Sequence, residues 1–319
     1  MSRNGQKIAV MFPGQGSQFL GMGEGFLAAD PEARALLAMA EEVSGLPLGR
    51  LMKDGPMEEL TRTLHLQPAL TVMNLICWQA LGKAGIVPDF VVGHSLGEYS
   101  ALCAAGILTP ADTLALVTER GRLMEREGGE HPGGMRAVLG FSLAEVQAVL
   151  AQLAPSLGVV VTANHNTPQQ VVISGELVAL EEASRQLTEQ GAKVIALNVA
   201  IANHSPLVQG ATADFRAAMV KVDFRSPTTP MLFNTTAAEE RQPDAIRAIM
   251  AGQLSSMVRW VDTLNELAAR GVTTFIEVGP KTVLSGLLKK TLSRDAGATC
   301  VQFDEPAKLA ACLATLGAS

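Results

Sequence analysis

The chain has 319 residues, of which 48% are hydrophobic and 18% charged. This composition and length predict a compact globular protein, either one large domain or one that carries an inserted smaller domain, and exclude a peptide hormone, a disulfide scaffold and a disordered chain. The net charge of −6 argues against extensive binding to nucleic acid or to an anionic membrane, because both require a positive field.

The cysteines and the N-terminal sequence indicate a cytoplasmic protein. Four cysteines lie in apolar contexts without the CxxC spacing of a zinc site: Cys77, Cys103, Cys300 and Cys312. The apolar run that ends at Pro13 is too short for a signal peptide, and residues 64–82 are too polar to span a membrane. We therefore interpret the glycosylation sequons at Asn203 and Asn234 as chance matches.

Short apolar runs alternate with helical patterns along most of the chain. The predicted strands cover residues 7–12, 88–95, 229–234, 273–279 and 298–303. The predicted helices, with apolar residues about every 3.6 positions, cover 31–45, 70–84, 97–107, 111–127, 206–220, 242–256, 260–270, 281–292 and 305–316. This alternation predicts an α/β fold with a mostly parallel sheet and helices on both faces.

Residues 135–198 follow a different order, β-α-β-β-α-β, which is typical of a ferredoxin-like unit. Its first helix opens with the capping box Ser142-x-x-Glu145. A Gly/Pro-rich stretch at 127–135 introduces it. We predict an inserted small domain at 130–199 and a hydrolase-like catalytic domain formed by 1–129 and 200–319.

The sequence GHSLG at 93–97 has the pattern of a nucleophile elbow, with a predicted strand before it and a predicted helix after it. Gly93 and Gly97 would let the backbone turn sharply. Ser95 would then lie above a helix N-terminus, where backbone N–H groups, that of Leu96 first, can stabilise an oxyanion. We expect Ser95 to be a nucleophile.

A serine nucleophile needs a base, and the chain has five histidines. His94 is next to Ser95 and should point away from it, His65 precedes a predicted helix and His131 lies in the predicted linker. His165 and His204 remain. The polar turn around His204 follows the predicted insertion and could overhang the sheet, but the local sequence fits a surface histidine equally well.

The glycine-rich segment FPGQGSQ at 12–18 follows the first predicted strand. It is not a dinucleotide fingerprint, because Phe19 stands where the third glycine is required, and it lacks the GK[ST] of a phosphate loop. Its glycines allow close backbone approach, and Gln15 offers an amide. The residues alone leave its role open.

Taken together, these motifs resemble malonyl-CoA:acyl-carrier-protein transacylases and the acyltransferase domains of polyketide synthases. The resemblance spans nearly the whole chain and rests on segments in the family's order: FPGQGSQ at 12–18, QPAL at 67–70, GHSLGEYSAL at 93–102, Arg120-Gly121, NHSPL at 203–207, Gln253 and EVGP at 277–280. An inserted ferredoxin-like unit is also a feature of that family.

The resemblance implies that Ser95 is acylated, that His204 is its base, and that backbone N–H groups of Leu96 and Gln15 hold the oxyanion. It implies that Arg120 pairs bidentately with the malonyl carboxylate, a geometry that suits a guanidinium. Without the resemblance, Arg120 would be interpreted as a solvated helix charge. Because the resemblance gives Ser95 a histidine base and no aspartate partner for that histidine, we expect a Ser-His dyad.

The resemblance assigns further residues around this dyad. A backbone carbonyl near Gln253 would orient the histidine, and Gln67 and Asn164 match polar positions that line the family's site. Relatives restricted to malonyl often carry Phe directly before the histidine, where this chain has Asn203. We expect malonyl to be preferred but larger α-substituents to be less strictly refused.

The implied partners are malonyl-CoA, as a substrate, and holo acyl carrier protein, with no metal or redox cofactor. Carrier proteins of this type are generally acidic, and four basic residues near one predicted helix could provide a docking surface: Lys281, Lys289, Lys290 and Arg294. Two alternatives are a serine thioesterase and a non-catalytic carrier-binding module. A trans-acting polyketide acyltransferase with broader donors also remains open.

Overall fold

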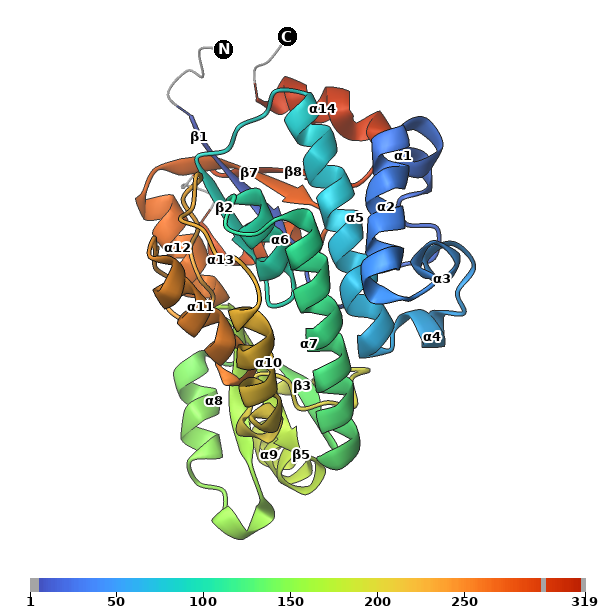
Figure 1. Cartoon of the computed structure of the whole chain (residues 1–319). Coiled ribbons are helices and arrows are strands. Elements are labelled where there is room, and N and C mark those ends of the chain that lie inside the picture. The colour runs from blue at the N-terminus through green and yellow to red at the C-terminus, as the bar shows by residue number, and fades with distance from the viewer. Residues whose placement is uncertain (1–5, 294–296, 317–319) are drawn as a thin grey trace.

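The computed structural model describes residues 6–293 and 297–316. Two separate sheets organise the chain, and helices surround the larger one (Figure 1). The larger sheet is parallel with strand order β2-β1-β7-β8, and the smaller is antiparallel with order β4-β5-β3-β6. The predicted α/β class with a parallel sheet is therefore observed.

The larger sheet is covered by helices on both faces. Its strands are β1 (Lys7–Phe12), β2 (Phe90–Gly93), β7 (Val272–Val278) and β8 (Thr299–Phe303). Its helices are α1 (Glu24–Ala29), α2 (Pro31–Ser44), α3 (Leu48–Asp54), α4 (Met57–Leu60), α5 (Thr63–Lys83), α6 (Gly97–Ala104), α7 (Pro110–Glu130), α10 (Gly210–Val220), α11 (Pro243–Gly252), α12 (Trp260–Ala269), α13 (Val283–Thr291) and α14 (Leu309–Thr315).

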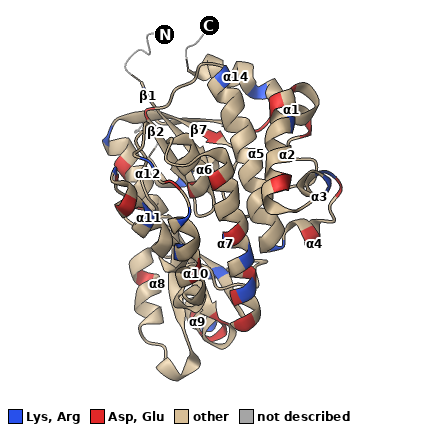
Figure 2. Ribbon diagram, viewed as in Figure 1, with Lys and Arg blue, Asp and Glu red and all other residues tan. Residues whose placement is uncertain are grey.

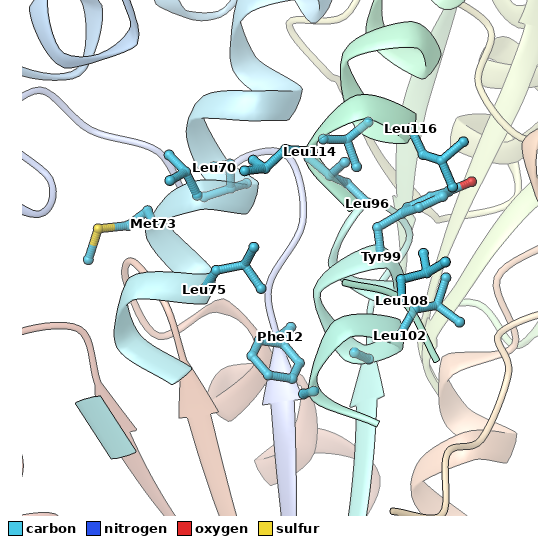
Figure 3. Packing of buried hydrophobic residues seen from close by; sticks show 14 of the residues in the cluster. Phe12, Leu70, Met73, Leu75, Leu96, Tyr99, Leu102, Leu108, Leu114 and Leu116 are labelled. Carbon is cyan, nitrogen blue, oxygen red and sulfur yellow. The ribbon is translucent and has the colours of Figure 1, made fainter. Parts of the chain in front are cut away.

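Burial on both faces explains why β1 is continuously apolar. Val10 and Phe12 belong to the core that includes α5, α6 and α7, whereas Ala9 and Met11 belong to the core that includes α12 and α13. Alternate side chains of a strand point to opposite faces, so a strand covered on both sides has no polar face. Figure 3 shows side chains of α5 and α6 converging on Phe12 at the end of β1.

Helix α5 is longer than predicted. It begins at Thr63, seven residues before the predicted start at 70, and contains Pro68 near its N-terminal end. Burial along most of its length, rather than an amphipathic pattern, stabilises it, and it carries almost no charge (Figure 2). The prediction that His65 precedes a helix is therefore wrong, because that residue lies within α5.

The predicted strand at 229–234 is reduced to two isolated bridges, from Met231 to Val91 and from Leu232 to Glu239. Pro230 has no N–H to donate to a ladder, and the chain turns back after Phe233, where the N–H of Ala237 bonds to the Phe233 carbonyl. This turn nevertheless brings Asn234 beside the end of β2. The short helices α1, α3 and α4 were not predicted.

The smaller sheet follows the predicted order of β-α-β-β-α-β. Its elements are β3 (Gly133–Leu139), α8 (Leu143–Leu150), β4 (Val160–Thr167), β5 (Gln170–Glu176), α9 (Leu177–Glu189) and β6 (Lys193–Ala196). The capping box of Ser142 and Glu145 is formed. Strand β4 is tied to the rest of the chain, since the N–H of His165 donates to the Val258 carbonyl at 2.9 Å.

Of the helices in residues 6–293 and 297–316, none combines the length and the apolar character that a membrane span requires.

Candidate active site

The expected strand-turn-helix surrounds Ser95. Strand β2 ends at Gly93 and α6 begins at Gly97, and between them Ser95 has a φ of 52°, in the left-handed region. A Cβ added at Gly93 would lie 2.1 Å from the Gly97 carbonyl oxygen, and one at Gly97 would lie 2.0 Å from the Phe12 carbonyl oxygen. Only glycine permits this close packing, which exposes Ser95 at the carboxyl end of the strand.

Ser95 and His204 are brought together from opposite parts of the chain. The Ser95 hydroxyl lies 2.7 Å from His204 Nε2. His204 Nδ1 lies 3.1 Å from the Gln253 carbonyl oxygen and 3.0 Å from that of Ser256, so Nδ1 carries the proton and Nε2 accepts one from the serine. Backbone carbonyls, rather than a carboxylate, therefore orient the imidazole.

His94 and His65 bond to other residues. His94 Nε2 lies 2.8 Å from Asn166 Oδ1, and His65 Nδ1 lies 2.8 Å from the Glu59 carbonyl oxygen. His165 lies on β4, and no bond to Ser95 is found for it among the described residues. Of the two histidines left open by the residues alone, His204 is the one bonded to Ser95.

Burial and the positive charge of Arg120 lower the pKa of His204 to about 3. Desolvation is the larger cause, because the imidazolium would lose its hydration. The imidazole is therefore neutral at physiological pH and available as a base.

Arg120 of α7 is fully buried, which overturns the interpretation as a solvated charge. Its Nη2 donates to Gln253 Oε1 at 3.3 Å, and its guanidinium carbon lies 5.5 Å from the centroid of the Tyr99 ring. Nε and Nη1 have no hydrogen-bond partner among the described residues. A buried guanidinium with two unpaired donor atoms suits a carboxylate ligand.

The Gln15 loop packs against the elbow. A Cβ added at Gly14 would lie 2.5 Å from the His94 carbonyl oxygen and 3.5 Å from the Leu96 nitrogen. Asn74 of α5 holds this loop through a bond from Nδ2 to the Pro13 carbonyl at 3.1 Å. Gly14, which directly precedes Gln15, is thereby kept beside Leu96.

The sequence profile of the acyl transferase domain family matches residues 10–311. The chain belongs to this acyl transferase family. A malonyl CoA-acyl carrier protein transacylase of Bacillus subtilis is 40% identical over 289 residues, which cover 90% of this chain and 91% of that protein.

Two solved structures match this acyl transferase over nearly its whole length. A malonyl-CoA:acyl carrier protein transacylase from Xanthomonas oryzae superimposes with a TM-score of 0.92 at 38% identity, covering 97% of this chain and 98% of that one. A malonyl-transacylase in complex with a type II polyketide synthase acyl-carrier protein gives a TM-score of 0.93 at 33% identity, covering 97% and 100%.

The remaining predicted residues of this acyl transferase are buried, and no bond from them to Ser95 or His204 is found in the described residues. Gln67 Nε2 lies 3.2 Å from Met124 Sδ, and Asn164 lies on β4 opposite Val172. Asn203 precedes His204. The side-chain oxygens of Gln67 and Asn203 have no partner among the described residues, so both can accept a bond from a ligand.

Two residues that no sequence motif marks as part of the site, Asn234 and Glu98, support the turn at Ser95. Asn234 Oδ1 accepts the N–H of Ser95 at 2.7 Å, and its Nδ2 donates to the Gly93 carbonyl at 2.7 Å. Glu98 is fully buried beneath the nucleophile, and burial raises the pKa of its carboxyl to about 7. The only available signal was an acidic residue placed directly after the elbow.

A cavity of about 580 Å³ opens beside the Gln15 loop. Its lining includes Gln15, Arg62 of the α4–α5 connection, Glu125 of α7, and Val199 and Ile201 of the segment that leads to His204. The cavity therefore lies between the helices of the larger sheet and the chain that returns from the smaller one.

The described basic residues of the predicted docking surface lie on α13 and in the turn before it. Lys281 is the third residue after β7, and its Nζ donates to the Gly16 carbonyl at 3.3 Å. Lys289 and Lys290 lie in the last turn of α13. Because β7 and β8 are parallel, α13 leads from the carboxyl edge of the sheet back to the opposite edge, away from Ser95. Arg294 lies outside the described residues.

One group of side chains in the described residues could approach a metal ion, formed by Glu127, Glu130 and His131. Two of the three are exposed, and Glu127 is paired with Arg126 at 2.8 Å. The group lies at the end of α7, apart from Ser95.

Proposed function

We propose that this acyl transferase moves a malonyl group from malonyl-CoA to the phosphopantetheine thiol of acyl carrier protein. The observation that carries the proposal is the link between the dyad and Arg120. Gln253 bonds to the Ser95 carbonyl through Nε2 and to Arg120 through Oε1, so the nucleophile and the buried guanidinium are one amide apart. A short acyl group with a terminal carboxylate fits between them.

In the first half-reaction, His204 Nε2 takes the proton of the Ser95 hydroxyl as Oγ attacks the thioester carbonyl. Backbone N–H groups of Gln15 and Leu96 stabilise the oxyanion. The carbon–sulfur bond then breaks, and the proton on His204 passes to the coenzyme A thiolate. The product is a malonyl ester of Ser95.

In the second half-reaction, His204 takes the proton of the carrier thiol, whose sulfur attacks the ester carbonyl. Ser95 Oγ leaves and regains the proton from His204. The cavity beside Gln15 would admit the pantetheine arm of either thiol. Every step is acid–base and nucleophilic, so the proposed reaction uses no metal or redox cofactor, and malonyl-CoA is a substrate.

Asn203 and Gln67 are proposed to line the acyl site, because both are buried and their side-chain oxygens have no partner among the described residues. A malonyl group has only acceptor oxygens, so its contact would be with the NH₂ end of either amide. We further propose a contribution from Asn164, whose strand is anchored beside the carbonyls that hold His204. An Asn in place of the larger Phe before the histidine leaves room for an α-substituent. Malonyl would be preferred, with larger α-substituents less strictly refused.

The proposed organisation assigns 1–129 and 200–319 to a hydrolase-like catalytic domain and 130–199 to a ferredoxin-like subdomain. The elbow supports the former, and the antiparallel order β4-β5-β3-β6 supports the latter. We propose a cytoplasmic location, where both substrates would be found.

The test is the intact mass of the purified protein after incubation with malonyl-CoA, compared with Ser95→Ala. We expect a malonyl adduct on the wild type alone, which disappears when holo carrier protein is added. Steady release of free malonate without transfer would instead identify a thioesterase. A protein with neither adduct nor turnover would be a carrier-binding module.

Acyl selectivity tests the role of Arg120. Arg120→Ala should lower the rate of malonyl adduct formation by about 100-fold or more, because the carboxylate would enter a dry site without its partner. Acetyl adduct formation should fall far less. Arg122→Ala is the matched control, since that arginine lies on the same helix, is exposed and pairs with Glu119. Equal selectivity in both variants would remove Arg120 from the site.

A further inference from the structure

Glu98 occupies the centre of the polar network beneath the nucleophile. It lies in the first turn of α6 and is fully buried. Its Oε1 accepts the N–H of Asn234 at 2.7 Å, and its Oε2 accepts Nε2 of Gln253 at 2.9 Å. One carboxylate thus contacts both residues that hold Ser95.

The side chain of Gln253 lies between a group that only accepts hydrogen bonds and a group that only donates them. Its Nε2 donates to Glu98 and to the Ser95 carbonyl, and its Oε1 accepts from Arg120. A carboxylate cannot donate and a guanidinium cannot accept, so only one of the two amide orientations satisfies both neighbours. The charge state of Glu98 thereby determines which end of the amide faces Arg120.

We propose that Glu98 is a positioning residue that fixes, through the Gln253 amide, the direction in which Arg120 presents its unpaired N–H groups to the acyl carboxylate. This inference rests on the proposed malonyl transfer. The second arm, from Glu98 to Asn234, holds the elbow itself. The two arms can be separated experimentally because they use different oxygens of the carboxylate.

Glu98→Gln separates the arms. The new side chain can still accept the Asn234 N–H through its oxygen, but its NH₂ group would face the NH₂ group of Gln253. Relief requires the Gln253 amide to rotate, which turns a donor toward Arg120 and removes the bond to the Ser95 carbonyl. Arg120 would lose its side-chain acceptor, whereas the elbow would keep the two bonds from Asn234.

Two acyl donors report the two parts of the site. Malonyl-CoA requires Arg120, whereas p-nitrophenyl acetate acylates Ser95 without a carboxylate. We expect Glu98→Gln to lower kcat/KM for malonyl loading by about tenfold and to change the p-nitrophenyl acetate burst by less than about threefold. If Glu98 acted only as a counter-charge, its removal would instead strengthen malonyl binding, which would overturn the proposal.

A double-mutant cycle tests whether Glu98 acts through Gln253. Gln253→Leu removes the amide and leaves the backbone carbonyl that holds His204. In that background, Glu98→Gln should cause no further loss of malonyl loading. Additive losses, or equal losses with both acyl donors, would show that Glu98 acts on the fold in general and would contradict the inference.

Two controls keep the result interpretable. Thermal unfolding shows whether each variant is folded. If Glu98→Gln is insoluble, Glu98→Asp replaces it, because the shorter side chain moves the carboxylate away from Gln253 by the length of one methylene. We expect a smaller loss of malonyl loading in that variant. A wild type without a malonyl adduct would refute the proposed function. A wild type that is loaded normally beside an unaffected Glu98 variant would refute only the positioning role.

Discussion

His204 is buried next to Arg120, and both features favour its neutral form. An unperturbed histidine would be half protonated near pH 6.5 and would lose its function as a base below that pH. Here the pKa is lowered to about 3, so the base remains available through the mildly acidic range. The dyad needs no carboxylate, because the two carbonyls that accept from Nδ1 already fix the tautomer.

The pH dependence of Ser95 acylation tests this prediction. In stopped-flow pH jumps with p-nitrophenyl acetate, the burst rate should change by less than about threefold between pH 8 and pH 5, because a lowered pKa moves the acidic limb below that range. Ser95→Ala provides the background rate. Glu98, whose pKa is raised to about 7, titrates in the same range, so the profile is also measured in Glu98→Gln. A burst rate that still falls with a midpoint near pH 6.5 in that variant would contradict a neutral buried base.

At the scale of elements, the junction of β1, β2 and α6 depends on glycines. Gly97 lies against the Phe12 carbonyl and Gly93 lies against Gly97, so the helix starts almost in contact with two strand ends. In the proposed reaction, this packing would orient the N-terminus of α6 toward the oxyanion of the tetrahedral intermediate on Ser95. It also forces Ser95 into its left-handed conformation, a strain of about 1–3 kcal/mol that the surrounding contacts offset.

Gly97→Ala tests this junction. The added methyl group would approach the Phe12 carbonyl oxygen to 2.0 Å, so backbone must move. We expect a loss of about 3 kcal/mol in the free energy of unfolding and a large loss of acylation rate, measured by denaturant unfolding and by the acetate burst. Gly286→Ala, in α13 where no atom lies within 4 Å of the added Cβ, should be neutral or stabilise by up to about 1 kcal/mol.

At the scale of the whole molecule, the site is formed where the two sheets are joined. Ser95 follows strand β2 of the larger sheet, whereas His204 lies on the segment that follows β6 of the smaller sheet. The bond from His165 on β4 to Val258 ties the smaller sheet to the segment whose carbonyls orient His204. Movement of the smaller sheet would therefore alter the dyad.

The positions of three lysines predict which of them contribute to carrier docking. Lys281 lies at the carboxyl edge beside Gly16, whereas Lys289 and Lys290 lie at the far end of α13. We expect the double charge reversal Lys289→Glu/Lys290→Glu to change the apparent KM for holo carrier protein by less than about twofold. The reason is that solvent and salt screen charges at the far end of α13 from a carrier bound near Ser95. Lys281→Glu should raise it severalfold. A large effect of the double variant would restore the α13 surface as a docking site.

Local features of this site could be predicted from the sequence because local sterics produce them. Gly93, Ser95 and Gly97 are within five residues of one another, so their spacing alone predicts the sharp turn and the exposed hydroxyl. The strand at β1 and most helices were predictable for the same reason, since periodicity reports which side chains face the core. The prediction of a strand at 229–234 was wrong, although the segment is apolar, because Pro230 and the turn after Phe233 prevent a continuous ladder.

The tertiary structure decided which distant residues meet. His204 lies 109 positions from Ser95, and Asn234 lies 139 positions from it, so no local pattern distinguishes these residues from surface polar groups. The burial of Arg120 and Glu98 depends on helices and loops packed from several parts of the chain. The amino-acid sequence alone was enough to predict the strand-turn-helix around Ser95 and the α/β architecture, because short-range sterics and periodicity suffice for both. The base, the buried arginine and the network that orients them required long-range packing, since only the folded chain sets their distances and removes them from water.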